Sequence, residues 1–242
     1  MTSMSMQVVD YNKVITFKPR KQNNKVTGKD AEVYAFKTKE EISSMIKVFD
    51  KHILEATNNH QRKIAYRNKL LFVIGINVGI RASDLRTLKW SFFFDEQMNF
   101  KESYKFVPIK TSKQRKFVKI SFNNAVKQMI NSYIKEYPID NLDSYLFASR
   151  KGCKSVTVDG LRKIIKEAAV EAGITQNVGS HSLRKTFGFW CWRNASDKNK
   201  ALVILQQIFN HSSTQTTAKY IGILDEEIKD MFDSIDLGLD MV

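Results

Sequence analysis

Apolar residues recur at helical spacing along most of the chain, and one stretch near its middle changes to a period of two. Ile42, Met45 and Phe49, for example, follow one another at intervals of three and four residues, which places them on one face of a helix. Over residues 103–122 the alternation instead predicts a β-hairpin, with a basic tip at residues 110–116. The pattern therefore predicts a mainly α fold with one small antiparallel sheet, which belongs to the α+β class.

Local signals mark where the predicted helices begin and end. Thr38 and Glu41 fit a capping box, in which each side chain accepts a hydrogen bond from the other residue's backbone, so a first helix should begin there. Asn58-Asn59 are predicted to end it. A second helix should run over residues 61–79 and end at a glycine, and a third should carry residues 83–90. Further helices are predicted over residues 124–137, 158–172, 182–194, 200–209, 214–220 and 225–235.

The composition excludes several large classes of protein. With 43% apolar and 11% aromatic side chains among 242 residues, the chain can bury a core and is not a disordered sequence. Its longest apolar stretch, residues 70–80, is interrupted by polar residues and is shorter than the roughly 20 residues of a membrane span, so we expect no membrane partner. Residues 1–10 lack a signal pattern, which favours the cytoplasm. Cys153 and Cys191 lie outside any zinc-binding motif and are interpreted as ordinary thiols.

Charge is distributed unevenly along the chain. The net charge of +14 favours a polyanionic partner, because basic side chains that neutralise phosphates release counterions. Residues 223–242 carry seven acids against one lysine, a net charge of −6, which leaves +20 on residues 1–222. We therefore expect a basic N-terminal arm over residues 1–37, a basic central domain over 38–222, and an acidic C-terminal tail helix over 223–242 that contacts protein.

Four short segments carry residues suited to phosphate chemistry. Taken singly, each has an ordinary explanation, because arginine, lysine and histidine are common at helix starts and loop tips. Their order and spacing are more informative: Gly79-Ile-Arg81-Ala-Ser-Asp84, Lys110-Thr-Ser-Lys113-Gln-Arg-Lys116, His181-Ser-Leu-Arg184, and Phe209-Asn-His211 nine residues before Tyr220. Over about residues 38–222, this set resembles the tyrosine recombinases, the family that includes phage integrases and recombinases for resolution or inversion.

The resemblance implies a site-specific recombinase that cleaves and rejoins double-stranded DNA. Tyr220 matches the family's nucleophile, which joins the scissile phosphate as a 3′-phosphotyrosine and frees a 5′-hydroxyl. Arg81 and Arg184 match the arginines that grip the phosphate, and His211 matches a position that donates a further hydrogen bond to it. Because the phosphotyrosine conserves the bond energy, the resemblance implies no ATP, metal or other cofactor.

The remaining matched positions are implied to move protons or to orient the site. Lys110 matches the general acid that protonates the leaving 5′-oxygen, and we choose it over Lys113 and Lys116 because it precedes the small turn residues. His181 matches an acid/base helper near the nucleophile. Asp84, one turn after the first arginine, matches an acidic position that orients the site.

The sequence also departs from the family pattern. Asn210 stands where the family usually has glycine, and Lys185 stands where a histidine is frequent, but neither replaces a catalytic side chain. Many members carry a separate helical DNA-clamping domain, whereas about 37 residues precede Thr38 here, so a small recombinase and a catalytic fragment both stay open. Two other functions also stay open: a non-catalytic DNA-binding regulator with this fold, and a relaxing topoisomerase of the same chemical type.

The acidic tail has two interpretations. Its apolar residues Ile228, Met231, Phe232 and Ile235 recur at roughly helical spacing, so this helix could close the chain's own core. Alternatively, as the resemblance implies, it docks on a neighbouring subunit when the protein forms a homo-oligomer on DNA.

Overall fold

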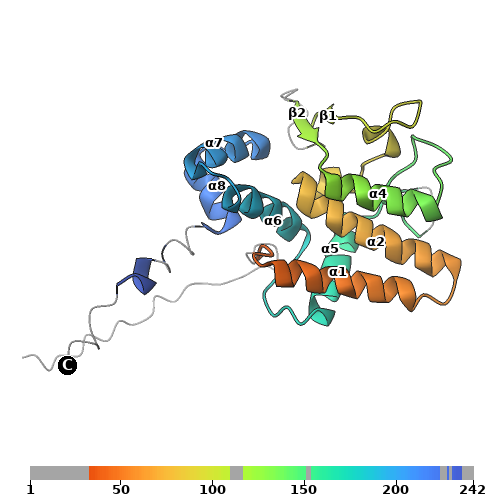
Figure 1. The fold of residues 1–242 in the computed structure, drawn as a ribbon, viewed down its shortest axis with the longest axis horizontal. Coiled ribbons are helices and arrows are strands. Elements are labelled where there is room, and N and C mark those ends of the chain that lie inside the picture. Colours follow the sequence, from red (N-terminus) through yellow and green to blue (C-terminus); the bar gives the residue numbers. More distant parts are fainter. Residues whose placement is uncertain (1–32, 110–116, 151–153, 224–227, 229–230, 236–242) are drawn as a thin grey trace, which may run out of the picture. The chain divides into compact units, whose positions relative to one another are not determined.

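Helices and one two-stranded sheet make up the part of the chain that the structure describes (Figure 1). The structure is a computed structural model and describes residues 33–109, 117–150, 154–223, 228 and 231–235. The predicted fold class is confirmed. In chain order the elements are α1 (Lys39–Leu54), α2 (Asn59–Val78), α3 (Ala82–Leu85), the 3₁₀ turn η1 (Trp90–Phe92), β1 (Ser103–Phe106), β2 (Val118–Ser121), α4 (Asn124–Glu136), α5 (Val158–Glu171), α6 (Ser180–Arg193), α7 (Lys198–Phe209) and α8 (Thr214–Ile221).

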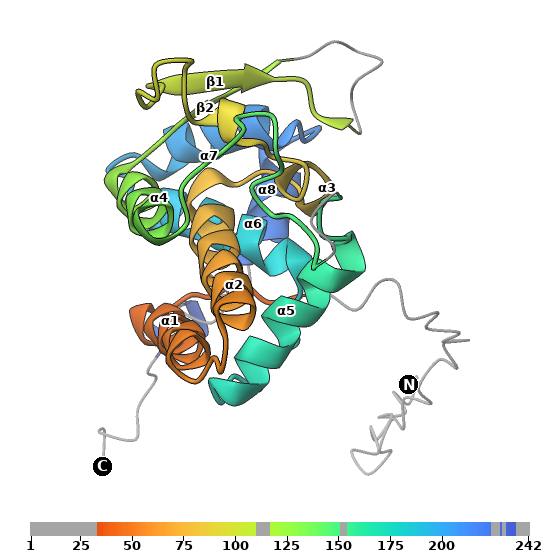
Figure 2. The same ribbon diagram turned by 90° about the vertical axis from the view of Figure 1, so that its right-hand side faces the viewer.

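Helix α2 lies at the centre of the larger hydrophobic cluster. Its side chains Leu70, Leu71, Phe72 and Ile74 are fully buried, because α1, α4 and α6 all pack against this helix. Figure 2 shows α2 running between α1 and α4 on one side and α5 on the other. Burying a large apolar side chain stabilises a fold by about 1.5–3 kcal/mol, so these four residues fix the position of α2 firmly.

A smaller hydrophobic cluster holds the last three helices together. Its buried members include Phe189 of α6, Leu205 and Phe209 of α7, and Ile221 at the end of α8. Helix α6 belongs to both clusters, since Leu183 packs in the larger one and Phe189 in the smaller one. We call the boundary between the two clusters the seam; α6 crosses it between Leu183 and Phe189.

The ends of the first two helices follow from local hydrogen bonds. The predicted capping box is confirmed: the Glu41 amide donates to Thr38 Oγ1, and the Thr38 amide donates to Glu41 Oε2, both at 3.1 Å. The prediction that Asn58-Asn59 end the first helix is wrong, because α1 ends at Leu54 and the Asn58 side chain caps the second helix by accepting from the Gln61 amide at 2.9 Å.

The predicted third helix is also wrong in its length. Helix α3 ends at Leu85, and Trp90 begins a separate 3₁₀ turn. The backbone between them pairs with a distant loop, since Leu88 O accepts from the Leu146 amide at 2.8 Å and the Trp90 amide donates to Ser144 O at 3.3 Å. Partners some 55 residues away thus replace the hydrogen bonds that would continue a helix.

The hairpin forms where the change of period predicted it. Strands β1 and β2 pair in antiparallel register, with Tyr104 opposite Ile120. The ring centroids of Tyr104 and Phe92 are 4.1 Å apart. The basic tip, residues 110–116, lies outside the described residues, and so do Lys110 and its neighbours Lys113 and Lys116.

Most of the predicted N-terminal arm, residues 1–32, also lies outside the described residues. In the tail, Met231–Asp233 are helical, and Ile228, Met231, Phe232 and Ile235 are each more than half exposed. None of the described helices is long and apolar enough to cross a membrane.

Candidate active site

A left-handed turn at the end of α2 brings Arg81 to the seam. Gly79 has a φ of 68°, a conformation that glycine adopts at little cost, and a Cβ at this position would overlap the ring of Phe187 on α6. Arg81 follows as the first flanking residue of α3, and its Nη2 donates to Phe209 O at 3.2 Å. The sequence Gly-Ile-Arg therefore places a guanidinium beside the end of α7.

Arg184 joins the two sides of the seam. From α6, its Nη1 donates to Gly79 O at 2.8 Å and its Nη2 donates to Phe209 O at 3.1 Å. Its guanidinium also lies 4.3 Å from the centroid of the Phe209 ring. Burial lowers the pKa of Arg184 to about 10, so the side chain remains charged at neutral pH. Hydrogen bonds from a charged donor contribute about 1.5–3 kcal/mol each, so this arginine stabilises the fold across the seam.

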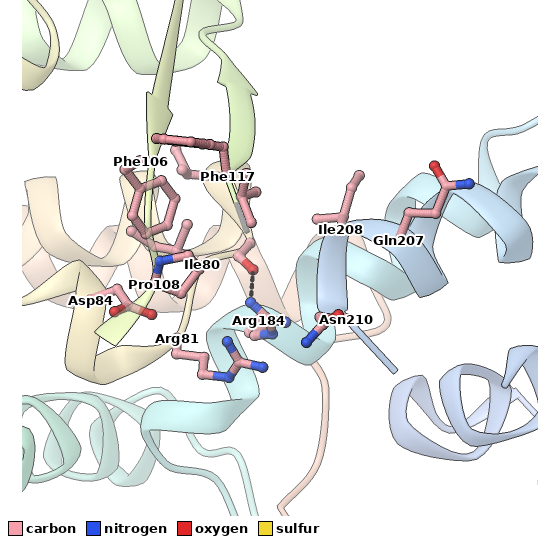
Figure 3. Close-up of a pocket in the computed structure, with 13 residues that line it drawn as sticks. Ile80, Arg81, Asp84, Phe106, Pro108, Phe117, Arg184, Gln207, Ile208 and Asn210 are labelled. Atoms are coloured by element: carbon pink, nitrogen blue, oxygen red, sulfur yellow. Dashed lines mark hydrogen bonds between the residues drawn. The ribbon is translucent and has the colours of Figure 1, made fainter. Parts of the chain in front are cut away.

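A cavity of about 220 Å³ opens in front of the two arginines (Figure 3). Arg81 and Arg184 lie side by side in its wall. Another part of the wall is lined by Asp84 and by the hairpin residues Phe106, Pro108 and Phe117. Each guanidinium carries five N–H donors in a planar fork. Because the carbonyls use only some of them, the rest are available to the oxygens of an anion in the cavity.

Tyr220 lies beside the arginines on α8. Its ring centroid is 5.1 Å from that of His211 and 5.5 Å from that of Phe209, and both pairs are edge to face. Burial raises the pKa of the Tyr220 hydroxyl, and the positive charges of Arg184 and Arg81 act in the opposite direction. The hydroxyl thus lies close enough to both guanidiniums for their charge to favour its ionised, nucleophilic form.

His211 is neutral in this environment. Burial, together with the charges of Arg184 and Arg81, lowers the pKa of the imidazole to about 4. Its Nδ1 lies 3.1 Å from the hydroxyl of Thr217, which donates to Ser213 O at 3.2 Å. In that arrangement the hydroxyl accepts from Nδ1–H, and its single proton can instead turn toward Nδ1. When Thr217 donates to Nδ1, the ring proton is on Nε2, and the imidazole can then donate to a phosphate oxygen while uncharged.

Asp84 connects the first arginine segment to the hairpin. Its Oδ1 accepts from the Ile109 amide at 2.9 Å, while Oδ2 is buried with no hydrogen-bond partner among the described residues. Only 4% of the residue is exposed, and this burial raises the pKa of the carboxyl group, against the hydrogen bond from Ile109 and the charges of Arg81 and Arg184. Asp84 therefore holds the backbone immediately before Lys110.

The structure gathers five of the seven predicted site residues at the seam: Arg81, Asp84, Arg184, His211 and Tyr220. Of these five, Arg81, Asp84 and Arg184 line the cavity, and His211 and Tyr220 lie behind it beside Phe209. His181 lies in the first turn of α6 with an exposed side chain and does not line the cavity. The seventh, Lys110, lies outside the described residues.

The sequence prediction missed two features of the site. Phe209 provides the carbonyl that both arginines share and the ring beneath Arg184. Lys185 is only 7% exposed, and its Nζ lies 5.4 Å from the centroid of the Tyr220 ring. The Phe209 carbonyl has no sequence signal, because a backbone acceptor is independent of residue type. Lys185 was noted only as a departure from the family pattern, and its burial was not predicted because a lysine in a helix is usually a surface residue.

This arrangement can bind a tetrahedral anion and present a phenolic nucleophile to it. The donors are two guanidiniums and an imidazole, and the phenol lies against the same guanidiniums. Over the described ranges, no three His, Cys, Asp or Glu side chains are placed to hold one metal ion.

Comparisons with known proteins identify the family. A sequence model of the phage integrase family matches residues 37–227. The chain is 34% identical over 161 residues to the probable integrase/recombinase YoeC of Bacillus subtilis, covering 66% of this chain and 80% of that one. It is 28% identical over 177 residues to the tyrosine recombinase XerD of Oceanobacillus iheyensis, covering 71% of this chain and 55% of that one.

Solved structures show the same fold. The crystal structure of the XerA recombinase matches with a TM-score of 0.59 at 20% identity, over 88% of this chain and 68% of that one. A XerH site-specific recombinase in a post-cleavage complex with palindromic difH substrate matches with a TM-score of 0.55 at 23% identity, over 76% of this chain and 48% of that one. With a family match over most of its length, the chain belongs to the phage integrase family of tyrosine recombinases.

Proposed function

We propose that this protein is a site-specific recombinase that cuts and rejoins double-stranded DNA through Tyr220. The observation that carries the proposal is the packing of Tyr220 against Phe209, whose carbonyl accepts from both Arg81 and Arg184, the two guanidiniums that line the cavity. The basic charge of residues 1–222 would attract the DNA backbone, and the XerH relative is known in complex with its DNA substrate. We extend the proposal to a cytoplasmic site of action, where such DNA would be met.

The chemistry consists of one transesterification and its reverse. Tyr220 Oη attacks the scissile phosphorus, the bond from phosphorus to the 5′-oxygen breaks, and the DNA 3′-end becomes a phosphotyrosine. Rejoining occurs when a 5′-hydroxyl attacks the phosphotyrosine and releases Tyr220. The number of ester bonds is unchanged at each step, so no external energy source is required.

The transition state places extra negative charge on the non-bridging phosphate oxygens. Arg81 and Arg184 are held in place by Gly79 O and Phe209 O before the DNA arrives, so little reorganisation is needed when that charge develops. His211 Nε2 supplies a further donor, with the ring held by Thr217. The phosphate is thus bound most strongly in its transition state.

Proton transfer completes the proposal. The leaving 5′-oxygen takes a proton from Lys110, which follows the anchored residue Ile109 on the hairpin. His181, exposed at the start of α6, assists the departure of the Tyr220 proton. Strand exchange between two such sites then yields recombination.

The tail is proposed to join subunits on DNA. Ile228, Met231, Phe232 and Ile235 are between 54% and 71% exposed, so they are not buried in the core of their own chain. An apolar helix face of this kind is stabilised when it docks on a neighbour. A protein truncated after Ile223, the last residue buried in the smaller cluster, should therefore bind single sites but lose synaptic complexes, as measured by gel mobility. Normal synapsis by the truncated protein would contradict this part of the proposal.

A covalent adduct is the direct test of the cleavage chemistry. A pool of nicked duplexes with randomised inverted-repeat arms is incubated with the protein, and DNA that remains attached after denaturation is sequenced. The nick lets the freed strand diffuse away, so the phosphotyrosine accumulates. Wild-type protein should select a site, and Tyr220→Phe should bind that site without forming the adduct.

Other outcomes would assign a different function. Specific binding with no adduct from wild-type protein would indicate a regulator, and the enzymatic proposal would fail. Adducts that relax supercoiled plasmids but never exchange strands between two sites would indicate a topoisomerase.

A further inference from the structure

The segment that leads into α1 is bound along the side of the seam. We call residues 33–37 the strap. The Tyr34 amide donates to Asn177 O at 2.7 Å, and the Phe36 amide donates to Thr186 Oγ1 at 2.9 Å. Trp190 Nε1 in turn donates to Phe36 O at 2.9 Å. The strap therefore follows α6 through successive hydrogen bonds.

Consecutive strap residues insert into different hydrophobic clusters. Ala35, 2% exposed, belongs to the smaller cluster with Phe209 and Ile221. Phe36, fully buried, belongs to the larger cluster and packs edge to face on Phe72 of α2 with 5.6 Å between ring centroids. The strap thus connects the half of the fold that carries Arg81 to the half that carries Tyr220.

Lys37 extends this connection to the end of the nucleophile's helix. Its amide donates to Glu41 Oε2 at 2.8 Å, and its Nζ donates to Gly222 O at 2.7 Å. The ammonium also lies 5.4 Å from the centroid of the Phe189 ring. One residue therefore spans the start of α1, the side of α6 and the end of α8.

The contact at Gly222 is suited to holding α8. Gly222 is the left-handed C-cap of this helix, with a φ of 75°, and it lies two residues after Tyr220. The last carbonyls of a helix carry its negative dipole end, where a cation is stabilising. Lys37 supplies this cation from another part of the chain.

We infer that Lys37 is a positioning residue for the cleavage reaction, which keeps α8 docked so that Tyr220 stays against Arg184 and Arg81. The inference rests on the proposed role of Tyr220 as nucleophile. Ile223, which follows Gly222, is 1% exposed in the smaller cluster, so the hydrogen bond lies among the last packed residues before the acidic tail. Lys37 thereby couples the strap, the nucleophile's helix and the base of the tail.

The test compares Lys37→Met with Lys37→Arg in single-turnover adduct formation on the selected nicked duplex. Lys37→Met retains the aliphatic stem but loses the charged hydrogen bond, and cleavage should slow by about tenfold with unchanged DNA affinity. Lys37→Arg keeps a cation and should recover most of the rate. Lys39→Met removes the same charge from an exposed side chain two residues away and should cleave like wild type.

The leaving group separates this role from proton transfer. On a duplex whose scissile 5′-oxygen is replaced by sulfur, departure needs no general acid, because a thiolate is a stable leaving group. A misplaced nucleophile is not corrected by this change, so Lys37→Met should stay slow on the sulfur substrate. Recovery on sulfur, or a wild-type rate on oxygen, would overturn the inference.

A measurement without DNA judges the strap separately from the recombinase chemistry. Hydrogen exchange of the α8 amides should be faster in Lys37→Met than in Lys37→Arg or Lys39→Met, while the α2 amides should exchange alike in all three. If wild-type protein formed no adduct, the proposed function would fail and this exchange would still test whether Lys37 holds α8. Equal α8 exchange in all variants would refute the inference even with cleavage intact.

Discussion

Replacing Asp84 tests how the site holds Lys110, the proposed general acid. The carboxylate accepts from the Ile109 amide, the last described residue before Lys110. Asp84→Ala removes this acceptor, and the loss of a hydrogen bond to a charged group amounts to about 1.5–3 kcal/mol. If the hairpin must be held in the transition state, cleavage should slow by roughly 10- to 150-fold, since about 1.4 kcal/mol corresponds to a factor of ten.

Asp84→Asn is the matched variant. It keeps Oδ1 in place as an acceptor and removes only the charge, so we expect cleavage within about fivefold of wild type, because a neutral hydrogen bond is worth about half of a charged one. The alternative role for Asp84 is to balance the charges of Arg81 and Arg184, both of which act on its pKa. Under that role the Asn variant would be as slow as the Ala variant.

The assay is adduct formation on oxygen and sulfur versions of the selected duplex. Because the sulfur leaving group needs no proton, it should restore Asp84→Ala to about the wild-type rate on the same substrate if the defect lies in Lys110. A thermal melt of each variant would separate misfolding from misplacement. Equal slowness of Asp84→Ala on both substrates, in a protein that melts like wild type, would refute the link from Asp84 to the general acid.

Three further changes test other parts of the site. The free energies of unfolding of wild type and His211→Gln can be compared in urea at several pH values. The difference in favour of wild type should fall as the pH drops from about 6.5 to about 4, because the folded-state pKa of about 4 means that the unfolded chain takes up the proton first. Gly79→Ala should destabilise the fold by about 2–4 kcal/mol, because the new Cβ overlaps Phe187 and a non-glycine residue is strained in the left-handed conformation. Gly173→Ala, also at positive φ but in open space, should destabilise it by only about 1–2 kcal/mol. Equal losses of the free energy of unfolding in denaturant would contradict this reasoning. Arg184→Lys should slow adduct formation by about a hundredfold or more, since one ammonium cannot bond both carbonyls and a phosphate in the same fork geometry, and a near-normal rate would show that charge alone suffices.

Local signals predicted the elements that depend on neighbours in sequence. The capping box of Thr38 and Glu41, the glycine end of α2 and the period-two hairpin all arise from contacts within a few residues. The prediction for residues 83–90 was wrong because the backbone there pairs with the loop near Leu146, a contact that no local pattern encodes.

The candidate site was predicted in its residue types but not in its supports. Arg81, Arg184, His211 and Tyr220 were identified by order and spacing, and the fold brings them together. The Phe209 carbonyl is invisible in a sequence because every residue has a carbonyl. The contact between Lys37 and Gly222 joins residues 185 positions apart, so only the three-dimensional structure shows it.

At the seam, the side chains that join the two halves of the fold are the same ones that we propose bind the phosphate. Arg184 is buried, and the desolvation of its charge is offset in part by two carbonyls, one from each side of the seam. Arg81 adds a second positive charge, and the charges of both arginines add to burial, the larger cause, in lowering the pKa of His211. A phosphate would offset these charges, so DNA binding should draw the two halves of the fold together. When the enzyme releases its DNA, this attraction is lost. The hydrogen bond from Lys37 of the strap to Gly222 O then still keeps α8 docked.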